Sequence, residues 1–376
     1  MKHLLLAIVT TFASSLYAQQ TINASIIHDG IQRDYILYVP AIYTPGTPTP
    51  LVFNFHGYTS SATEQMYYGD FRPIADTANF LLVHPMGTLD PNNQPYWNAN
   101  WGGTVDDIGF TEALLDSLAV DYSINMDRVF STGMSNGGFM SYTLACELGH
   151  RFAAIASVTG TMNLNQSSTC TPSHPTPIME IHGTSDGTVP YTGLAGSMES
   201  IPNVLDYWVN FNNCTPTPIE TAVSNTSTTD GCTATHFIYE NGDNGVEVEH
   251  YRINNGGHTW PGSSFVVGTT NYDMDASEKI WEFFAKYDIN GKIGVNEINE
   301  TELTNISLSP NPANETLNIN GLIKESSSNK IITLRGEVIQ TSVDETSIDV
   351  SKLKPGVYFI VVQQGESVQS LKFIKQ

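Results

Sequence analysis

The sequence predicts an α/β fold with a mostly parallel sheet, followed by a small all-β unit. Between residues 20 and about 290, short apolar runs of strand character alternate with helical patterns. This alternation is typical of a parallel sheet covered by helices on both faces. Beyond Asp288 the chain becomes polar and then gives only short strand-like runs between turn signals. With 376 residues, 40 % of them apolar, the chain has room for one large domain and one small one.

The individual elements follow from these patterns. In the first part we expect strands at 35–39, 51–55, 80–83, 128–132, 153–158, 178–181 and 246–253. Helices are expected at 70–79, 107–122, 138–148, 201–211 and 277–287. The helix at 107–122 carries acidic residues in its first turn, where the helix dipole favours negative charge. In the last part we expect strands at 316–319, 330–334, 347–350, 357–362 and 371–374.

The charge distribution marks the same boundary. Residues 19–304 hold 8 basic and 31 acidic side chains, whereas residues 305–376 hold 7 of each. We therefore expect a main domain over 19–290, a linker over 291–304 and a second, β-sandwich domain over 305–376. The net charge of the whole chain is -22. A nucleic-acid partner is not expected, because such a chain can hardly assemble a basic surface.

The first 18 residues resemble a secretory signal peptide. Lys2 and His3 precede an apolar stretch at 4–12, and Ala18 offers a cleavage point. The apolar stretch is too short to span a bilayer, which needs about 20 residues, and we expect no membrane span elsewhere. The sequence thus predicts an exported protein; the alternative for this segment is a buried N-terminal helix.

The four cysteines agree with export. An even number in an oxidising compartment predicts two disulfides, for which three pairings exist. The pairs Cys146–Cys170 and Cys214–Cys232 close the shortest loops and are favoured. A loop of this size would stabilise the fold by roughly 3 kcal/mol. A zinc site is the competing interpretation, but no C-x-x-C or H-E-x-x-H spacing occurs, and we expect neither a metal nor a cofactor.

The sharpest chemical signal is a G-x-S-x-G motif at 133–137, between a predicted strand and a predicted helix. In a nucleophile elbow the serine occupies a strained turn, so the positions two before and two after it must lack bulky side chains. The N-terminus of the following helix favours the negative charge that develops during acyl transfer. This context predicts Ser135 as a nucleophile.

A serine nucleophile needs a base and an acid, which in α/β-hydrolases follow in the order Ser, acid, His. Asp186 lies on the loop after the strand at 178–181, and His258 follows the strand at 246–253. The order and the loop positions predict a catalytic triad of Ser135, Asp186 and His258. An ordinary turn aspartate and a loop histidine are the alternatives. Weaker candidates for the acid are Asp206, Asp230 and Asp243.

Two backbone amides are expected to bind the oxyanion. One is the amide of Asn136, directly after the nucleophile, and the other is that of Tyr58, on the loop after an early strand. On the same loop, His56 is interpreted as structural. Asp106 and Asp107 start a predicted helix, so we expect them to cap it rather than to bind a metal.

Tryptophans in two loops are candidate walls of the substrate pocket. Trp260 lies two residues beyond His258, and Trp101 lies with Trp97 in a loop rich in Gly and Asn. A ring so near the predicted base could form a wall of the acyl or alcohol pocket. Packing in the core is the alternative for each of them.

Five motifs, in order along residues 25–288, resemble one known family. They are Val105-Asp-Asp-Ile-Gly-Phe, Arg128-Val-Phe-Ser-Thr-Gly, Met134-Ser-Asn-Gly-Gly-Phe-Met, His182-Gly-Thr-Ser-Asp-Gly and Gly256-Gly-His-Thr-Trp-Pro-Gly. The chain is thereby similar to the secreted polyhydroxybutyrate depolymerase / feruloyl esterase family, which includes carbohydrate esterase family one. The resemblance implies an α/β-hydrolase fold and catalytic roles for the three residues already chosen. It also implies disulfides where the cysteine pairs lie.

The last 72 residues resemble the C-terminal sorting domain of the type IX secretion system. The matching segments are Leu308-Ser-Pro-Asn-Pro-Ala, Leu353-Lys-Pro-Gly-Val-Tyr-Phe-Ile and Lys372-Phe-Ile-Lys, in residues 305–376. The resemblance implies export through the periplasm to the cell surface or the medium, with the type IX machinery as a partner. A carbohydrate-binding β-module is the alternative, but the segment contains no Trp.

Together these observations predict a secreted serine esterase that hydrolyses carboxylic esters through an acyl-enzyme. A feruloyl esterase or a polyhydroxybutyrate depolymerase-like enzyme is favoured, so the expected substrate is a feruloylated polysaccharide or a polyester. The alternatives are an acetyl-xylan esterase, a serine peptidase of the same fold and a surface binding protein without catalysis.

Overall fold

A computed structural model of the chain describes residues 19–265, 267–294, 306–320, 327–333, 338–343, 345–364 and 367–376. The chain divides into a first unit that ends at Ile293 and a second unit that begins at Gly294. The expected signal peptide at 1–18 and most of the expected linker lie outside the described residues. Gly291 and Lys292, which begin that expected linker, pair with Tyr287 and Asp288 in a hairpin of the first unit.

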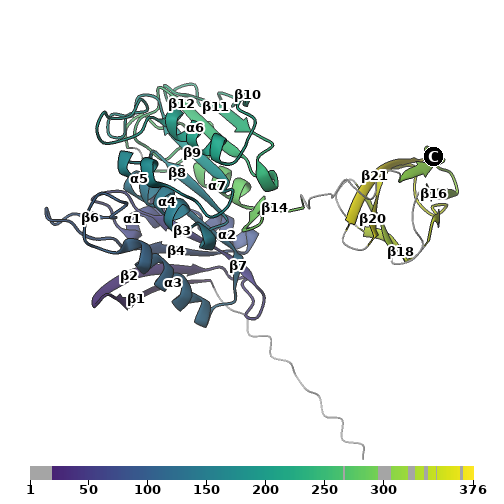
Figure 1. The fold of residues 1–376 in the computed structure, drawn as a ribbon, viewed down its shortest axis with the longest axis horizontal. Helices are drawn as coiled ribbons and strands as arrows, with labels where there is room; N and C mark the ends of the chain where they lie inside the picture. The colour runs from purple at the N-terminus through teal and green to yellow at the C-terminus, as the bar shows by residue number, and fades with distance from the viewer. Residues whose placement is uncertain are drawn as a thin grey trace, which may run out of the picture. The chain divides into compact units, whose positions relative to one another are not determined.

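A ten-stranded sheet runs through the first unit in the order β1-β2-β4-β3-β7-β8-β9-β12-β11-β10 (Figure 1). Its strands are β1 (Gln20–His28), β2 (Ile31–Val39), β3 (Thr49–Phe55), β4 (Leu81–Pro85), β7 (Ile124–Met134), β8 (Ala154–Val158), β9 (Ile178–Gly183), β10 (Ile219–Ala222), β11 (Thr233–Tyr239) and β12 (Val248–Asn254). The strands from β4 to β12 in this order pair in parallel, and the two strands at each edge add in antiparallel.

Helices cover both faces of this sheet (Figure 1). They are α1 (Ala62–Tyr68), α2 (Arg72–Ala78), α3 (Asp107–Asp121), α4 (Asn136–Glu147), α5 (Leu164–Thr169), α6 (Ile201–Phe211) and α7 (Ala276–Phe284). Short hairpins are formed by β5 (Thr88–Leu89) with β6 (Pro95–Tyr96) and by β13 (Tyr287–Asp288) with β14 (Gly291–Lys292).

The central strands are apolar at nearly every position because both of their faces are buried. In β3, Val52 packs in a cluster with residues of α2 and α7, whereas its neighbours Leu51 and Phe53 pack in a cluster with residues of α3 and α4. Successive side chains of a strand point to opposite faces, so one strand contributes to two cores. The alternation in the sequence is therefore explained by two layers of helices around one sheet.

The second unit is built from two antiparallel sheets. One contains β15 (Ser307–Ser309), β16 (Thr316–Asn320) and β19 (Ser347–Asp349); the other contains β17 (Ser327–Thr333), β18 (Val338–Val343), β20 (Gly356–Gln364) and β21 (Ser367–Lys375). Leu317 and Ile348 of the first sheet share a buried cluster with Ile331, Ile360 and Phe373 of the second. The expected sandwich arrangement is present. In the described part of the chain, no helix has the length and apolarity that crossing a membrane requires.

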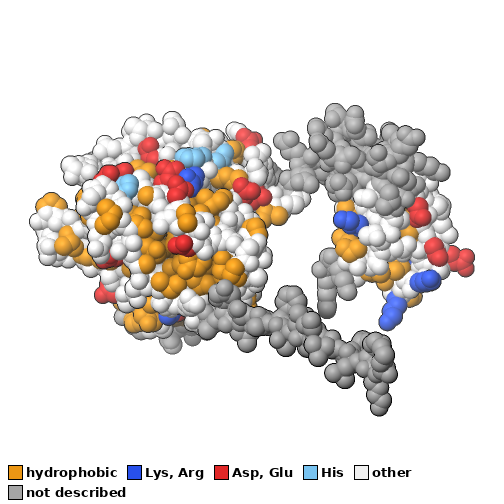
Figure 2. Space-filling view, turned by 90° about the horizontal axis from the view of Figure 1, so that it is seen from below, with side chains coloured by type: hydrophobic (Ala, Val, Ile, Leu, Met, Phe, Trp, Pro, Cys, Tyr) orange, Lys and Arg blue, Asp and Glu red, His pale blue; other side chains and the backbone are white. Residues whose placement is uncertain are grey.

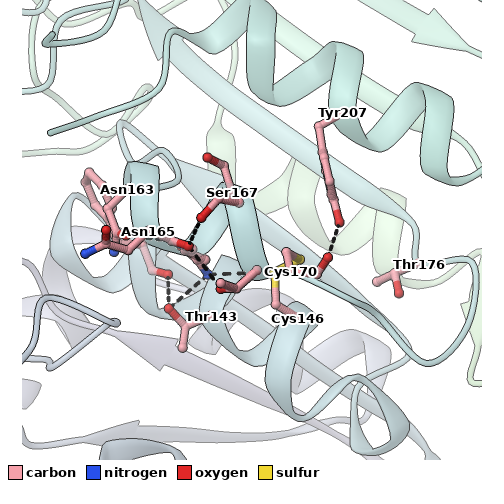
Figure 3. The surroundings of a disulfide bond; sticks show 12 residues. Thr143, Cys146, Asn163, Asn165, Ser167, Cys170, Thr176 and Tyr207 are labelled. Atoms are coloured by element: carbon pink, nitrogen blue, oxygen red, sulfur yellow. Dashed lines mark hydrogen bonds between the residues drawn. A yellow bond between two sulfur atoms is a disulfide. The ribbon is translucent and has the colours of Figure 1, made fainter. Parts of the chain in front are cut away.

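One of the two expected disulfides is present. Cys146, on α4, is bonded to Cys170, which directly follows α5. The hydroxyl of Tyr207 on α6 donates a hydrogen bond of 2.9 Å to the Cys170 carbonyl (Figure 3). The bond thus joins the helix that follows the G-x-S-x-G motif to a short helix beside it.

The prediction of a disulfide between Cys214 and Cys232 is wrong. Both thiols are free and buried, and burial raises the pKa of each to about 11. They lie at opposite ends of β11: Cys232 directly precedes this strand, whereas the amide of Thr215 donates to the carbonyl of Glu240, just beyond its other end. Seven residues of extended chain separate the ends by roughly 20 Å, far beyond the reach of a disulfide.

Candidate active site

Loops at the carboxyl ends of neighbouring parallel strands carry the three predicted triad residues. Ser135 directly follows β7, Asp186 lies on the loop after β9, and His258 lies on the loop after β12. Because these strands run parallel, their carboxyl ends share one edge of the sheet. The amide of Ser185 donates to the carbonyl of Gly256 at 2.9 Å, which ties the second loop to the third.

Ser135 occupies a strained turn between β7 and α4. Its φ is 55° and its ψ is -118°, a conformation that few non-glycine residues adopt. The turn is held at both sides, because the Ser135 amide donates to Val158 of β8 at 2.8 Å and its carbonyl accepts from Phe139 of α4 at 3.0 Å. The serine precedes the first turn of a helix, whose first amides have no intrahelical acceptor.

The two glycines of the motif are required by close approach of the backbone. A Cβ on Gly133 would lie 2.6 Å from the carbonyl oxygen of Phe55, and a Cβ on Gly137 would overlap the same carbonyl. The glycines therefore let the elbow pack directly on the end of β3. This is the steric reason for the pattern in the sequence.

We expect Gly137→Ala to lower the free energy of unfolding by about 3 kcal/mol, because the new methyl group must displace the backbone of Phe55. Urea denaturation measures this loss. Gly187→Ala is the matched control, since a Cβ there meets no atom within 4 Å, and it should change stability by less than about 0.5 kcal/mol. Equal midpoints for the two variants would contradict the packing argument.

Asp186 and His258 are paired. Nδ1 of His258 lies 2.7 Å from Oδ2 of Asp186, and the other carboxylate oxygen accepts the amides of Thr188 and Val189. Burial alone would raise the pKa of Asp186, but the hydrogen bond and charge of His258 hold it below its ordinary value. An ionised carboxylate only accepts, so Nδ1 of His258 carries the proton. In the neutral imidazole, Nε2 is then free to accept one.

A second buried pair, Glu180 and His182, lies next to Asp186. Nδ1 of His182 lies 2.8 Å from Oε1 of Glu180, and Nε2 of His182 lies 3.4 Å from Oδ2 of Asp186. The hydroxyl of Tyr142 donates to Glu180 at 2.8 Å. Burial raises the pKa of Glu180. Burial would lower the pKa of His182, but the bond to Glu180 raises it. Both members of the pair therefore have a pKa above the ordinary value.

The Glu180–His182 pair was not predicted, although the sequence contains a signal for it. Glu180 and His182 lie two residues apart on the buried strand β9, which extends beyond the expected 178–181, so both side chains point to the same face. Charged groups on one buried face must be paired.

The loop with the expected second oxyanion donor lies against the elbow. A Cβ on Gly57 would be 3.5 Å from Cβ of Ser135. His56 fixes this loop: its Nε2 accepts the amide of Gly87 at 2.9 Å, and its Nδ1 donates to the carbonyl of Gly57 at 2.7 Å. Burial lowers the pKa of His56 to about 4, so the ring is neutral and its role is structural.

The Asn136 side chain is also committed to structure. Its Oδ1 accepts the amide of Trp97 at 2.6 Å, and its Nδ2 donates to the carbonyl of Trp97 at 3.0 Å. The backbone amide of Asn136 is the first of α4, where amides have no intrahelical acceptor. The amides of Asn136 and Tyr58 remain our predicted oxyanion donors.

Two cavities border Ser135. The larger, of about 550 Å³, is lined by Gly57, Tyr58, Ser60, Thr63, Glu64, Gln65, Tyr67, Tyr68, Met134, Ser135, His258, Phe265 and Val267. The smaller, of about 310 Å³, is lined by Tyr58, Tyr96, Trp101, Ser135, Asn136, Phe139, Thr188, Val189 and Met198. Ser135 and His258 thus share the larger cavity, and Ser135 and Asn136 share the smaller.

Of the two tryptophans predicted to form walls of the substrate pocket, one lines a cavity and the other is buried in the core. Trp101 lines the smaller cavity, 39 % exposed, with its ring centroid 5.3 Å from that of Phe139. The prediction for Trp260 is wrong: it is 1 % exposed and packs edge-on against Phe71, and its Nε1 donates to the hydroxyl of Ser277. The chain turns inward after His258, so proximity in sequence to the base does not bring this ring into the site.

The acidic residues at the start of α3 have different roles. Asp106 caps the helix by accepting the amide of Gly109, as expected. Asp107 does not cap; it is buried and accepts from Nη2 of Arg33 at 2.5 Å. Within the described residues, the ligand atoms of His28, Asp29 and Asp106 all lie within 4.8 Å of one another, but the two carboxylates are exposed and neither cavity contains them.

Comparisons with known proteins match both units. Residues 41–215 match the phospholipase/carboxylesterase family, and residues 307–376 match the secretion system C-terminal sorting domain. Among solved structures, an acetyl xylan esterase from Aspergillus awamori superposes with a TM-score of 0.52 at 15 % identity, covering 71 % of this chain and 99 % of that one. This likeness confirms the expected α/β-hydrolase fold.

Curated relatives are similar over the first unit. A bifunctional acetylxylan esterase/xylanase of Neocallimastix patriciarum is 25 % identical over 274 residues, 73 % of this chain but only 36 % of that protein. Feruloyl esterase D of Neurospora crassa is 27 % identical over 286 residues, 72 % of this chain and 86 % of that protein. The resemblance seen in the motifs therefore extends over most of the first unit.

Proposed function

Because this chain is an α/β-hydrolase of the phospholipase/carboxylesterase kind that ends in a type IX secretion sorting domain, we propose that it is a secreted serine carboxylesterase. One observation carries the proposal. Ser135, on a strained elbow, opens into the same cavity as His258, whose Nδ1 is bound to the Asp186 carboxylate. A serine with these neighbours is equipped for nucleophilic attack on a carbonyl carbon.

In the proposed mechanism, Nε2 of His258 takes the proton of Ser135 as its Oγ attacks the ester carbonyl. Asp186 keeps the imidazole in the required tautomer and stabilises its charged form. The amides of Asn136 and Tyr58 donate to the tetrahedral oxyanion, beside the positive end of α4. His258 then protonates the departing alcohol. Finally, His258 activates the water that releases the acid and restores Ser135.

The sorting domain marks the chain as a secreted or cell-surface protein. We propose that the type IX machinery recognises residues 305–376 after residues 1–18 have directed the chain to the periplasm. A surface rich in acidic side chains suits a soluble exported enzyme, and the face of the first unit in Figure 2 shows acidic groups at several places and few basic ones.

The proposed substrates are esters of plant polysaccharides. Acetylxylan and feruloyl esterases are the named activities of the relatives, and the two cavities offer room on both sides of Ser135. A feruloylated polysaccharide is favoured over an acetylated one, because aromatic side chains line both cavities. A polyester of the polyhydroxybutyrate kind is the second candidate, favoured by the apolar side chains Phe265 and Val267 at the larger cavity.

A panel of substrates tests this proposal. Methyl ferulate, feruloylated arabinoxylan, acetylated xylan, poly-3-hydroxybutyrate and a peptide p-nitroanilide are assayed side by side with the purified protein. We expect release of ferulate at the highest kcat/KM and no cleavage of the anilide. Faster cleavage of the peptide than of every ester would identify a peptidase instead, and inactivity towards all five would favour a binding protein.

A further inference from the structure

Ser135 lies between two separate cavities. The cavities share only Tyr58 and Ser135 in their linings. His258 lines the larger cavity but not the smaller one, and Asn136 lines the smaller cavity but not the larger one. An ester attacked by Ser135 therefore has one of its two parts beside the base and the other beside the start of α4.

The chemistry of acyl transfer determines which cavity holds the acyl group of the ester and which holds its alcohol. The bond from Ser135 Oγ to the acyl carbon forms, and the bond from that carbon to the alcohol oxygen breaks. The proton taken from Ser135 by His258 is passed to the alcohol oxygen as it leaves. That oxygen must be within hydrogen-bond reach of Nε2 of His258, so the alcohol lies on the side of the base. The acyl group is then left on the other side.

We infer that the smaller cavity binds the acyl group and selects a flat aromatic acid, and that the larger cavity binds the alcohol. This assignment rests on the proposed esterase function. Besides Tyr58, which both cavities share, three rings from separate segments line the smaller cavity: Tyr96, Trp101 and Phe139. No charged side chain lines it. Such a wall suits the ring of a hydroxycinnamoyl group, whereas an acetyl group would leave most of the cavity unfilled.

The larger cavity has a different lining. It also has rings, those of Tyr67, Tyr68 and Phe265 in addition to the shared Tyr58. Unlike the smaller cavity, it adds the polar groups of Ser60, Glu64 and Gln65, one of them a carboxylate. The hydroxyl of Ser60 donates to the Glu64 carboxylate at 2.8 Å, so hydrogen-bonding groups and rings face the same space. This mixture suits an alcohol with several hydroxyl groups, such as a sugar.

Two variants and two substrates test the assignment. Methyl ferulate has an aromatic acyl group and a methyl alcohol, whereas p-nitrophenyl acetate has a small acyl group and an aromatic alcohol. We expect Trp101→Ala to lower kcat/KM for methyl ferulate by roughly tenfold and to change p-nitrophenyl acetate less than twofold. Tyr67→Ala should show the opposite pattern. Trp101→Phe, which keeps a ring beside Phe139, should retain most of the activity on methyl ferulate.

A reversed pattern, or equal losses on both substrates in each variant, would overturn the assignment of the cavities while leaving the esterase function intact. If the unmodified protein hydrolyses neither substrate, the proposed function itself fails. Ile219→Ala, an exposed position on β10 outside both cavities, is the control and should leave both rates unchanged. Thermal midpoints of the variants confirm that each one is folded before its rates are compared.

Discussion

Ser135→Ala is expected to lower kcat on methyl ferulate by a factor on the order of 10⁵, with little change in KM. Without the hydroxyl no acyl-enzyme can form, and His258 has no proton to take. The cavities and the oxyanion amides remain, so substrate binding persists. The measurement compares purified variant and unmodified protein at saturating ester.

Ser168→Ala controls for nonspecific effects, because this exposed hydroxyl only donates to the carbonyl of Asn165 within α5. It should retain full activity. A Ser135→Ala protein that keeps more than a tenth of the turnover would contradict the role of Ser135. Urea denaturation should give both variants the stability of the unmodified chain within about 0.5 kcal/mol.

Glu180→Gln is expected to have the largest effect on stability, a loss of about 3 kcal/mol or more. The carboxylate accepts from both His182 and Tyr142, and an amide can accept on one side only. One buried donor is therefore left without a partner, and a charged His182 loses its counter-ion. Activity should fall too, because Nε2 of His182 lies 3.4 Å from the acid of the candidate triad.

Urea denaturation compares this variant with Glu220→Gln. Glu220 lies exposed on the edge strand β10, and its nearest cation is Arg252 at 4.0 Å. An exposed pair of this kind contributes little, so the control should lose less than about 1 kcal/mol. Similar losses in the two variants would show that the Glu180–His182 pair is not a stabilising contact.

The candidate triad could be predicted because each of its members is marked by local sequence. Ser135 lies in a short motif whose two glycines are recognisable in the sequence although they pack on Phe55 of β3, and Asp186 and His258 follow buried strands closely. Parallel pairing then brings those strand ends together without further information. The central strands and most helices were predictable for a similar reason, since burial on both faces leaves long apolar runs.

Two of the elements that escaped prediction, the edge strands β1 and β10, have weak burial patterns. Every residue of β10 is exposed, and β1 buries none of its residues fully. Such edge strands are held by backbone pairing with a neighbour, β1 with β2 and β10 with β11, and this leaves little trace in hydrophobicity.

The two wrong site predictions both used distance along the chain as a guide to distance in space. Cys214 and Cys232 are 18 positions apart but lie at opposite ends of a strand. Trp260 is two positions from His258 but packs inward against Phe71. The rings that line only the smaller cavity, from Tyr96, Trp101 and Phe139, share no sequence motif, because tertiary packing alone brings them together.

Covalent labelling identifies the nucleophile of the protein without a substrate. The protein is treated with phenylmethylsulfonyl fluoride, and the modified residue is located by mass spectrometry of its peptides. We expect one added group, on Oγ of Ser135, with loss of esterase activity in proportion to labelling and much slower labelling in a His258→Ala variant. Complete inactivation with the label on another residue, or full activity after Ser135 is labelled, would contradict this expectation.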